Sequence, residues 1–247
     1  MRILTYNLWD SPAGMPEREK HIRQVILSCN ADILCLQEVS DTDILHTLAE
    51  AAACPYIQYS KDSGIAVLTG KTFLPAWQYR YASAVILKEK TFTVQIVNVH
   101  LPWNSAAERE EAVLRINRQA KNQDADYTIL TGDFNGTDTD AVHRYLMGEC
   151  SLRGSDAYYF DLALSYASKN KNSPLPTLDF HHNPRWGIWE PENTLEIPMR
   201  CDRIYLRNPY PKPLPVLQAC GIFGTEIFPE TGLCASDHYG VYADLQF

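Results

Sequence analysis

Short apolar runs that end in polar residues recur along the whole chain. The first is "RILTYN" at residues 2–7, and the second is "ADILCLQEV" at residues 31–39. Similar runs follow as "GIAVLTG", "YASAVILKE", "FTVQIVNVHL", "YTILTG", "CDRIYLR" and "HYGVYADLQF". Runs of this length, rich in aliphatic and β-branched residues, predict β-strands. A charged turn at Lys88–Lys90 predicts that the strands on either side form a hairpin.

Helical patterns separate several of these strands. Pro16 and the acidic residues after it favour a helix start, because proline suits the first turn and acids interact with the positive end of the helix dipole. Apolar residues then recur at helical spacing up to Cys29. Further helices are predicted within "SDTDILHTLAEAAA", "SAAEREEAVLRINRQAKN" and "DTDAVHRYLMG". Residues 152–196 show little periodicity and are predicted to be irregular.

These elements predict one α/β domain over residues 1–247. The chain shows no internal repeat, low-complexity tract or linker. Hairpins combined with intervening helices favour mixed or antiparallel sheets over a purely parallel one. No apolar run approaches the roughly 18–20 residues that a membrane-spanning helix needs. Met1 leads directly into the first predicted strand without the apolar stretch of a signal peptide, so we expect a cytoplasmic protein.

The net charge and the cysteine spacing argue against several classes of protein. The formal net charge of −8 argues against coating a nucleic acid, which requires many phosphates to be neutralised. It does not oppose a site that holds one phosphate or gathers carboxylates around a cation. The seven cysteines form no C-x-x-C pair, so neither a structural zinc site nor a disulfide framework is predicted.

Polar residues suited to metal or phosphate binding stand at the ends of the predicted strands. In chain order they are Asn7, Glu38, His100, Asp133 with Asn135, Asp202, and Asp237 with His238. Each has an ordinary structural interpretation when taken alone: turn formers, solvated strand ends or buried histidines with satisfied hydrogen bonds. If the strands lie side by side, however, these side chains meet at one rim, where rigid strands hold them.

The order of the motifs resembles the endonuclease/exonuclease/phosphatase superfamily. The matching segments are "TYNLW", "LQEV", "NVHL", "GDFN", "CDRIY" and "SDHYG", which extend from residue 5 to residue 240. This group includes deoxyribonucleases, abasic-site endonucleases, neutral sphingomyelinases, inositol-polyphosphate 5-phosphatases and tyrosyl-DNA 5′-phosphodiesterases. The resemblance implies a four-layer α/β sandwich of two packed mixed β-sheets flanked by helices. It also implies hydrolysis of a phosphate ester.

Chemistry and resemblance together suggest a role for each residue. Oxygen ligands favour Mg²⁺ or Mn²⁺, and Glu38 is the first-choice ligand, with Asn7 and Asp237 nearby as direct or water-mediated ligands. The remaining residues are expected to act on the phosphate ester. Asp133 is expected to orient or deprotonate the attacking water, Asn135 to fix Asp133 or contact the phosphate, His238 and His100 to donate to phosphate oxygens, and Asp202 to hold His238.

The substrate is predicted less narrowly than the reaction. A nucleic-acid end or a nucleotide-like diester is expected, because "HLPWNSAAERE" and "MRCDRIYLR" look most like the tyrosyl-DNA phosphodiesterase branch. Trp103 and Leu178 depart from that branch, and "SDHYG" is equally similar to sphingomyelinases. Phospholipid or inositol-phosphate hydrolysis therefore stays open, and a catalytically silent binding module is the remote alternative. No protein partner is predicted.

The stretch "PTLDFHHNPRWGIWEPENT", residues 176–194, has two interpretations. It is either a surface loop pinned by its own aromatics or a wall over the site that sets specificity. On the second interpretation Trp186 and Trp189 stack on the substrate and Arg185 adds a phosphate contact.

Overall fold

The computed structural model describes residues 1–188 and 194–247. The strands are β1 (Arg2–Asn7), β2 (Ile33–Gln37), β3 (Tyr56–Ser60), β4 (Ile65–Thr69), β5 (Phe73–Tyr79), β6 (Ala82–Lys88), β7 (Thr93–His100), β8 (Tyr127–Asp133), β9 (Tyr159–Asp161), β10 (Asp202–Arg207), β11 (Val216–Phe223) and β12 (Gly240–Gln246). The helices are α1 (Glu17–Cys29), α2 (Thr42–Ala51), the 3₁₀ turn η1 (Lys61–Ser63), α3 (Ala106–Lys121), α4 (Ala141–Leu146), α5 (Leu162–Asn170) and α6 (Pro184–Gly187).

The strands form two mixed sheets of six strands each. One sheet has the order β11-β12-β1-β2-β4-β3, and the other has the order β5-β6-β7-β8-β10-β9. Each sheet contains a parallel pair at its centre, β1 with β2 and β7 with β8, while its other pairs are antiparallel. The predicted β6–β7 hairpin is present.

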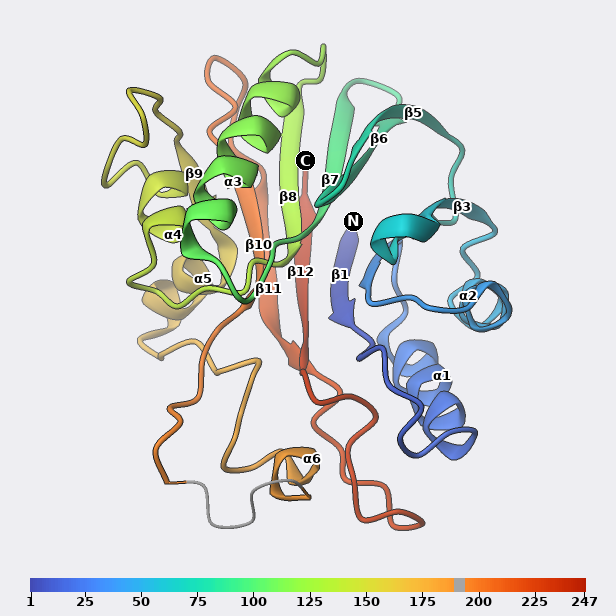
Figure 1. The fold of residues 1–247 in the computed structure, drawn as a ribbon. Coiled ribbons are helices and arrows are strands. Elements are labelled where there is room, and N and C mark those ends of the chain that lie inside the picture. The colour runs from blue at the N-terminus through green and yellow to red at the C-terminus, as the bar shows by residue number, and fades with distance from the viewer. Residues whose placement is uncertain (189–193) are drawn as a thin grey trace.

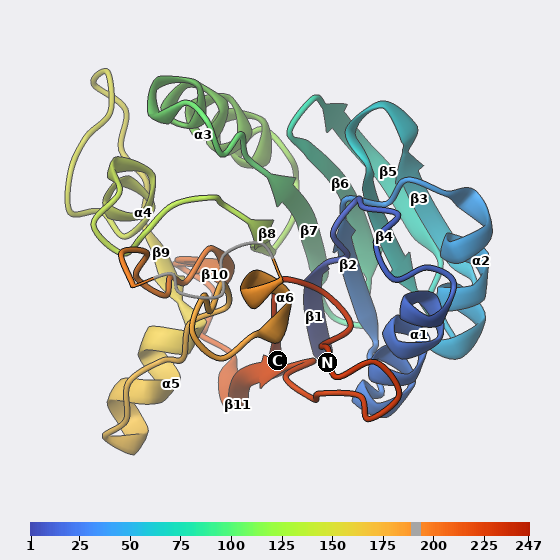
Figure 2. The same ribbon diagram turned by 60° about the horizontal axis from the view of Figure 1, so that its bottom comes forward.

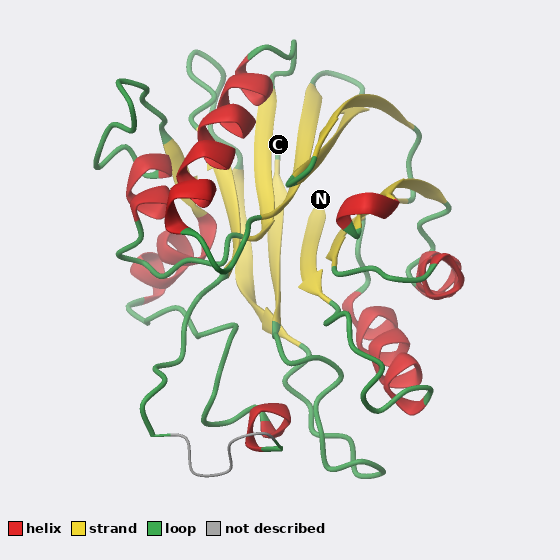
Figure 3. Ribbon diagram, viewed as in Figure 1, coloured by secondary structure: helices red, strands yellow, loops and turns green. Residues whose placement is uncertain are grey.

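Three buried apolar layers explain the sandwich. Side chains from both sheets, such as Ile33 and Ile129, interleave in the middle layer. On one outer face, α1 and α2 pack on β1, β2 and β4 through residues such as Ile26 and Leu48. On the other, α3 and α4 pack on β6, β7 and β8 through residues such as Ile116. The predicted four-layer α/β sandwich is confirmed (Figures 1 and 3).

Local capping agrees with the sequence where helices were predicted. Asp41 accepts a hydrogen bond from the backbone N–H of Asp43 at the start of α2, and Ser105 does the same for Glu108 in α3. These bonds satisfy backbone donors that the first helical turn leaves unpaired.

The prediction for residues 152–196 was wrong in part. The segment contains β9, α5 and α6 as well as loops. Helix α5 begins directly after β9, where the Asp161 carboxylate accepts from the Leu164 N–H. A helix of this length is stabilised mainly by packing, here against β10 and β11, so its local sequence signal is weak. Among the described residues, no helix has the length and apolar character needed to cross a membrane.

Candidate active site

Strand register places three of the predicted residues in one row. His100 at the end of β7 pairs with Asp133 at the end of β8, and Asp133 pairs in turn with Asp202 at the start of β10. All three strands are held by ladder hydrogen bonds, so these residues sit on a rigid mount at one rim of the sandwich. Gly132 permits the close approach, because a Cβ at that position would lie 1.9 Å from the Val99 carbonyl oxygen.

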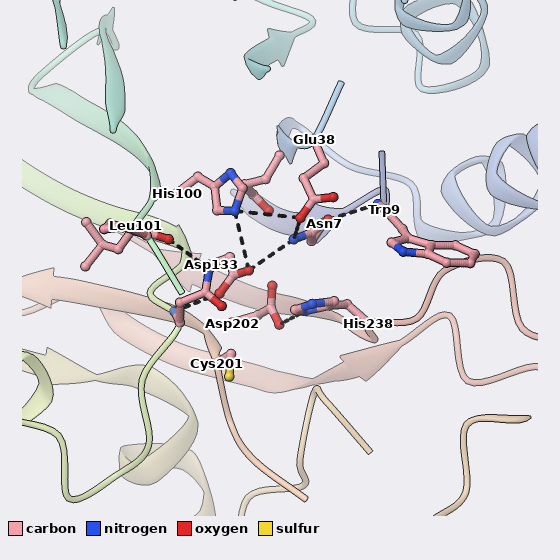
Figure 4. A network of polar contacts seen from close by, with 12 residues as sticks. Asn7, Trp9, Glu38, His100, Leu101, Asp133, Cys201, Asp202 and His238 are labelled. Atoms are coloured by element: carbon pink, nitrogen blue, oxygen red, sulfur yellow. Dashed lines mark hydrogen bonds and ion pairs between the residues drawn. The ribbon is translucent and has the colours of Figure 1, made fainter. Parts of the chain in front are cut away.

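The other sheet brings Asn7 and Glu38 to the same rim. Asn7 ends β1 and pairs with Gln37, and Glu38 follows directly with a left-handed φ of 55°. The Asn7 amide donates to Glu38 Oε1 at 2.9 Å and to Asp133 Oδ2 at 3.0 Å, which joins the two sheets across the site (Figure 4). The Asp10 N–H holds the second Glu38 oxygen at 2.7 Å. Asn7 therefore braces two carboxylates from opposite sheets.

His238 and Asp202 form a buried pair. His238 Nδ1 lies 2.9 Å from Asp202 Oδ2, and both side chains are almost fully enclosed. Burial by itself lowers the pKa of His238, but the Asp202 carboxylate outweighs that effect and holds the pKa well above 6.5. Because Nδ1 is occupied by Asp202, Nε2 is the nitrogen left to face a substrate.

His100 and Asn135 complete the surroundings of Asp133. His100 Nε2 lies 3.7 Å from Glu38 Oε1 and 3.8 Å from Asp133 Oδ2 (Figure 4). The Asn135 N–H donates to Asp133 Oδ1 at 2.8 Å, and its side-chain amide donates to the Leu101 carbonyl at 2.8 Å. Asn135 adopts a left-handed φ of 48°, which asparagine tolerates better than most residues. The turn that Asn135 forms thus fixes the Asp133 carboxylate.

Asp237 lies beside His238 and near Glu38. Burial, reinforced by the Glu38 carboxylate and opposed by His238, raises the pKa of Asp237 to about 6. The Ser236 hydroxyl donates to Asp237 Oδ1 at 3.2 Å. A carboxyl in this position gains from a nearby cation, which offsets the cost of its burial.

The donor set of this rim fits a hard divalent cation. Asp202 Oδ1 is buried and has no hydrogen-bond partner. One ligand atom from each of Asp133, Asp202 and His238 lies within 4.8 Å of the others. Glu38, whose side chain is 27% exposed, offers carboxylate oxygens at the open side. Carboxylate oxygens are the ligands that Mg²⁺ and Mn²⁺ take in proteins.

Arg185, predicted to contact a phosphate, is buried below the site. Its side chain is 2% exposed, its Nε donates to the Cys234 carbonyl at 2.6 Å, and its guanidinium lies 5.3 Å from the centre of the Trp9 ring. In this position the guanidinium is held by protein groups, and its contact with a phosphate stays a prediction. Trp186 Nε1 donates to the Asp237 carbonyl at 3.0 Å. Trp189, the third predicted wall residue, falls outside the described residues.

Two neighbours of the site were not among the predicted site residues. Trp9 has a left-handed φ of 60°, and its backbone N–H donates to Asn7 Oδ1 at 2.9 Å. Thr177 is buried, and its hydroxyl accepts from the backbone N–H groups of Cys201 and Asp202, both at 3.1 Å. A single threonine within an irregular stretch gives no local pattern from which this contact could be predicted. Of the two residues that depart from the tyrosyl-DNA phosphodiesterase branch, Leu178 is 8% exposed and Trp103 is 79% exposed.

The chain belongs to the endonuclease/exonuclease/phosphatase family. The model of that family matches residues 4–238, which is nearly the whole chain. The match includes every residue that the strand ends bring to the rim.

Several solved structures share this fold. Truncated Caenorhabditis elegans TDP2 superposes with a TM-score of 0.74 at 21% identity, covering 100% of this chain and 97% of that chain. D. rerio TDP2 complexed with a single-stranded DNA product gives 0.75 at 16% identity, covering 100% and 99%. An endonuclease/exonuclease/phosphatase from Bacteroides vulgatus gives 0.70 at 19% identity, covering 100% and 98%. At these identities the likeness concerns the fold.

One curated protein was also matched by sequence. It is an uncharacterised Caenorhabditis elegans protein, F14F9.5, which is 25% identical over 111 residues. The match covers 42% of this chain and 35% of that protein.

Proposed function

We propose that this protein is a divalent-metal-dependent phosphodiesterase that acts on a nucleic-acid end or a nucleotide-like substrate. The observation that carries the proposal is the row of His100, Asp133 and Asp202 at one rim, facing Asn7 and Glu38 from the other sheet. Basic, acidic and ligating groups thus converge on a space where a phosphate could bind. This is the set of groups that hydrolysis of a phosphate ester requires.

The roles follow from which atoms remain open. Glu38 would hold Mg²⁺ or Mn²⁺, with Asp237 near enough to contribute and Asn7 keeping Glu38 in place. When bound, the cation would neutralise negative charge that develops on the phosphate oxygens. Asp133, which is aligned by Asn7 and Asn135, would accept the proton of the attacking water.

The two histidines would then donate hydrogen bonds to the phosphate from different sides. His238 is kept protonated by Asp202 and would donate from Nε2 to a non-bridging oxygen. His100 would donate from the side of Glu38 and Asp133. Donors fixed before the reaction stabilise the charge of the transition state without reorganisation.

The preference for nucleic-acid ends rests on two similarities. The segments "HLPWNSAAERE", residues 100–110, and "MRCDRIYLR", residues 199–207, look like the tyrosyl-DNA phosphodiesterase branch, and one structural neighbour, D. rerio TDP2, was solved with a single-stranded DNA product. A net charge of −8 suits contact with a short end better than contact with a long duplex.

A substrate panel with the purified protein tests the proposal. The panel contains an oligonucleotide with an aromatic group on its 5′ phosphate, sphingomyelin, an inositol polyphosphate and a chromogenic phosphodiester, each with Mg²⁺, Mn²⁺ or chelator. We expect cation-dependent hydrolysis of the oligonucleotide adduct and the chromogenic ester, and no hydrolysis by Glu38→Gln. Preference for sphingomyelin or the inositol polyphosphate would show that the substrate belongs to that class and is not a nucleic-acid end. No hydrolysis of any ester with either cation would indicate a binding module.

A further inference from the structure

The segment Thr177–Trp186 contacts the backbone on both sides of the Asp202–His238 pair. At its start, the Thr177 hydroxyl accepts from the Asp202 N–H at 3.1 Å, and the Thr177 carbonyl accepts from the Tyr239 N–H at 2.7 Å. One buried residue therefore touches the backbone at Asp202 and at the neighbour of His238. Its exposed fraction is 1%, so these bonds do not compete with water.

The end of the same segment holds the loop that leads into β12. Asn183 Nδ2 donates to the Ser236 carbonyl at 2.9 Å, and Trp186 Nε1 donates to the Asp237 carbonyl at 3.0 Å. Arg185 adds the bond to the Cys234 carbonyl described above. Helix α6 lies beside this loop in both views (Figures 1 and 2).

These contacts matter because, within the described part of the chain, the loop has no sheet partners. Residues 234–238 precede β12, so their carbonyl groups need bonds from elsewhere when buried. Side chains of the segment supply bonds to three of these carbonyls, from Asn183, Arg185 and Trp186. Asn183 is fixed in turn, because its Oδ1 accepts from the Arg185 N–H at 3.1 Å at the start of α6.

We propose that Thr177, Asn183 and Trp186 are positioning residues that set the distance and orientation of His238 relative to Asp202. The proposal rests on the proposed function, because it assigns His238 a part in turnover. It assigns Trp186 a positioning role instead of the predicted wall role, and the observation that supports it is the bond from the indole N–H to the Asp237 carbonyl. Misplacing a reacting group by about 1 Å can cost a factor of about 100 in rate.

The first test compares substitutions of Thr177 with a matched control. Thr177→Val removes the hydroxyl that accepts two backbone bonds, and Thr177→Ser keeps it. Thr128→Val is the control, because Thr128 is equally buried in β8 and bonds only to the Gln95 side chain at 3.3 Å. We expect Thr177→Val to lower kcat about 10- to 100-fold with KM within about threefold. Thr177→Ser and Thr128→Val should stay near wild type.

The second test uses Trp186→Phe, which keeps an aromatic ring and removes the indole N–H. We expect kcat to fall about three- to tenfold on both a small chromogenic diester and the larger substrate, the scale of one hydrogen bond. Trp77→Phe on β5, the edge strand of its sheet, is the control. It should leave kcat unchanged on both substrates. A rise in KM for the larger substrate alone would overturn the proposal in favour of a specificity wall.

A spectroscopic readout separates this proposal from the proposed function. The Nδ1–H signal of His238 in ¹H–¹⁵N spectra reports the bond to Asp202 whether or not the protein turns over an ester. We expect the signal to shift or broaden in Thr177→Val and to stay in place in Thr177→Ser and Thr128→Val. An unchanged signal in a folded Thr177→Val, or, if that variant fails to fold, in Trp186→Phe, would overturn the positioning role. Absence of hydrolysis by the wild type would reject the function alone.

Discussion

Two largely buried ionic clusters, of which Asp138 is the most exposed member, lie back to back on strand β10, and they differ in charge balance. Asp202 and Arg203 are consecutive, so they point to opposite faces of the sheet, and each is 1% exposed. Asp202 faces the active site. Arg203 reaches Asp161 at 3.1 Å and Asp138 at 2.7 Å, and Arg200 binds the same two carboxylates at 2.9 and 2.8 Å.

The cluster around Arg203 pairs two guanidiniums with two carboxylates. Burial alone raises the pKa of Asp161, but Arg200 and Arg203 outweigh it and hold the pKa below 3.8. The active site contains four carboxylates, from Glu38, Asp133, Asp202 and Asp237. Among the described residues, none of the four has a lysine or arginine within ion-pair distance; Glu38, Asp133 and Asp202 each have a histidine as ion-pair partner, and Asp237 has none.

This difference in charge balance is expected to separate a structural cluster from a reactive one. A balanced buried network satisfies its own charges, and removing one member leaves another uncompensated. A site with more carboxylates than positive groups keeps a negative electrostatic potential. A bound cation or a protonated histidine reduces that potential. Stability and activity are therefore expected to respond to substitutions in different clusters, although both clusters share β10.

The largest expected effect is on turnover when the active site loses its proposed base. Asp133→Asn should lower kcat about 10²- to 10⁴-fold, the range for a group that transfers a proton. Its melting temperature should fall by less than that of Asp161→Asn, because removal of one of several crowded negative charges offsets the loss of an acceptor for Asn7 or Asn135. Steady-state kinetics on a chromogenic diester, together with thermal unfolding, measures both. Turnover within tenfold of wild type would contradict the role of Asp133.

Substitutions in the Arg203 cluster should change the free energy of unfolding. Asp161→Asn leaves Arg200 and Arg203 short of a buried partner and should lower the free energy of unfolding by about 3–5 kcal/mol. The comparison variant is Glu89→Gln, which breaks a partly exposed pair with Lys71 and should cost no more than about 1 kcal/mol. Urea unfolding provides the values. Equal losses in both variants would show that the Arg203 cluster contributes no more than a surface pair.

Cation binding should stabilise only through the active site. Mg²⁺ or Mn²⁺ at about 100 times its dissociation constant should add about 2.7 kcal/mol to the free energy of unfolding. The increment should be lost in Glu38→Gln and kept in Asp161→Asn, measured as the shift in unfolding midpoint on adding the cation. If the cation-dependent gain in stability is instead lost in Asp202→Asn and kept in Glu38→Gln, the cation binds to the group of Asp133, Asp202 and His238.

Taken over a single pH unit, the smallest expected effect comes from the balanced cluster. Burial, together with the positive charge of Arg203, lowers the pKa of His143 from 6.5 to about 4. The unfolded chain then binds a proton between these two values while the folded protein does not. Stability should therefore fall as pH drops from 6.5 to about 4, by up to about 1.4 kcal/mol per pH unit from this residue.

The variant His143→Asn isolates this contribution. Its side chain can still face the Tyr205 hydroxyl, which lies 2.7 Å from His143 Nδ1, but it cannot titrate. Urea unfolding at pH 7, 6 and 5 should show a flatter pH dependence than in wild type. Asp138 and Asp161 have pKa values below 3.8, so they titrate at a lower pH than this window. They are also present in both the wild type and the variant, so they do not contribute to the difference between them. Identical slopes would show that His143 titrates normally in the folded protein.

The sequence by itself determined the central strands and the helices that cover them. Every strand predicted from an apolar run lies inside a sheet, where burial on both faces requires a continuous apolar sequence. The strands that were not predicted, β3, β5, β9 and β11, are the four edges of the two sheets. An edge strand is partly exposed, as the burial pattern of β11 shows, so its composition resembles that of a loop.

For the candidate site, the sequence determined which residue types stand at the strand ends, and the tertiary structure decided how they meet. Asp133, Asp202 and His100 become neighbours only through strand register, which links residues far apart in the chain. The burial of Arg185 and the contacts of Thr177 depend likewise on which backbone groups the fold brings within reach. Local sequence encodes side-chain chemistry and periodicity, whereas a long-range hydrogen bond is set by the packing of the whole domain.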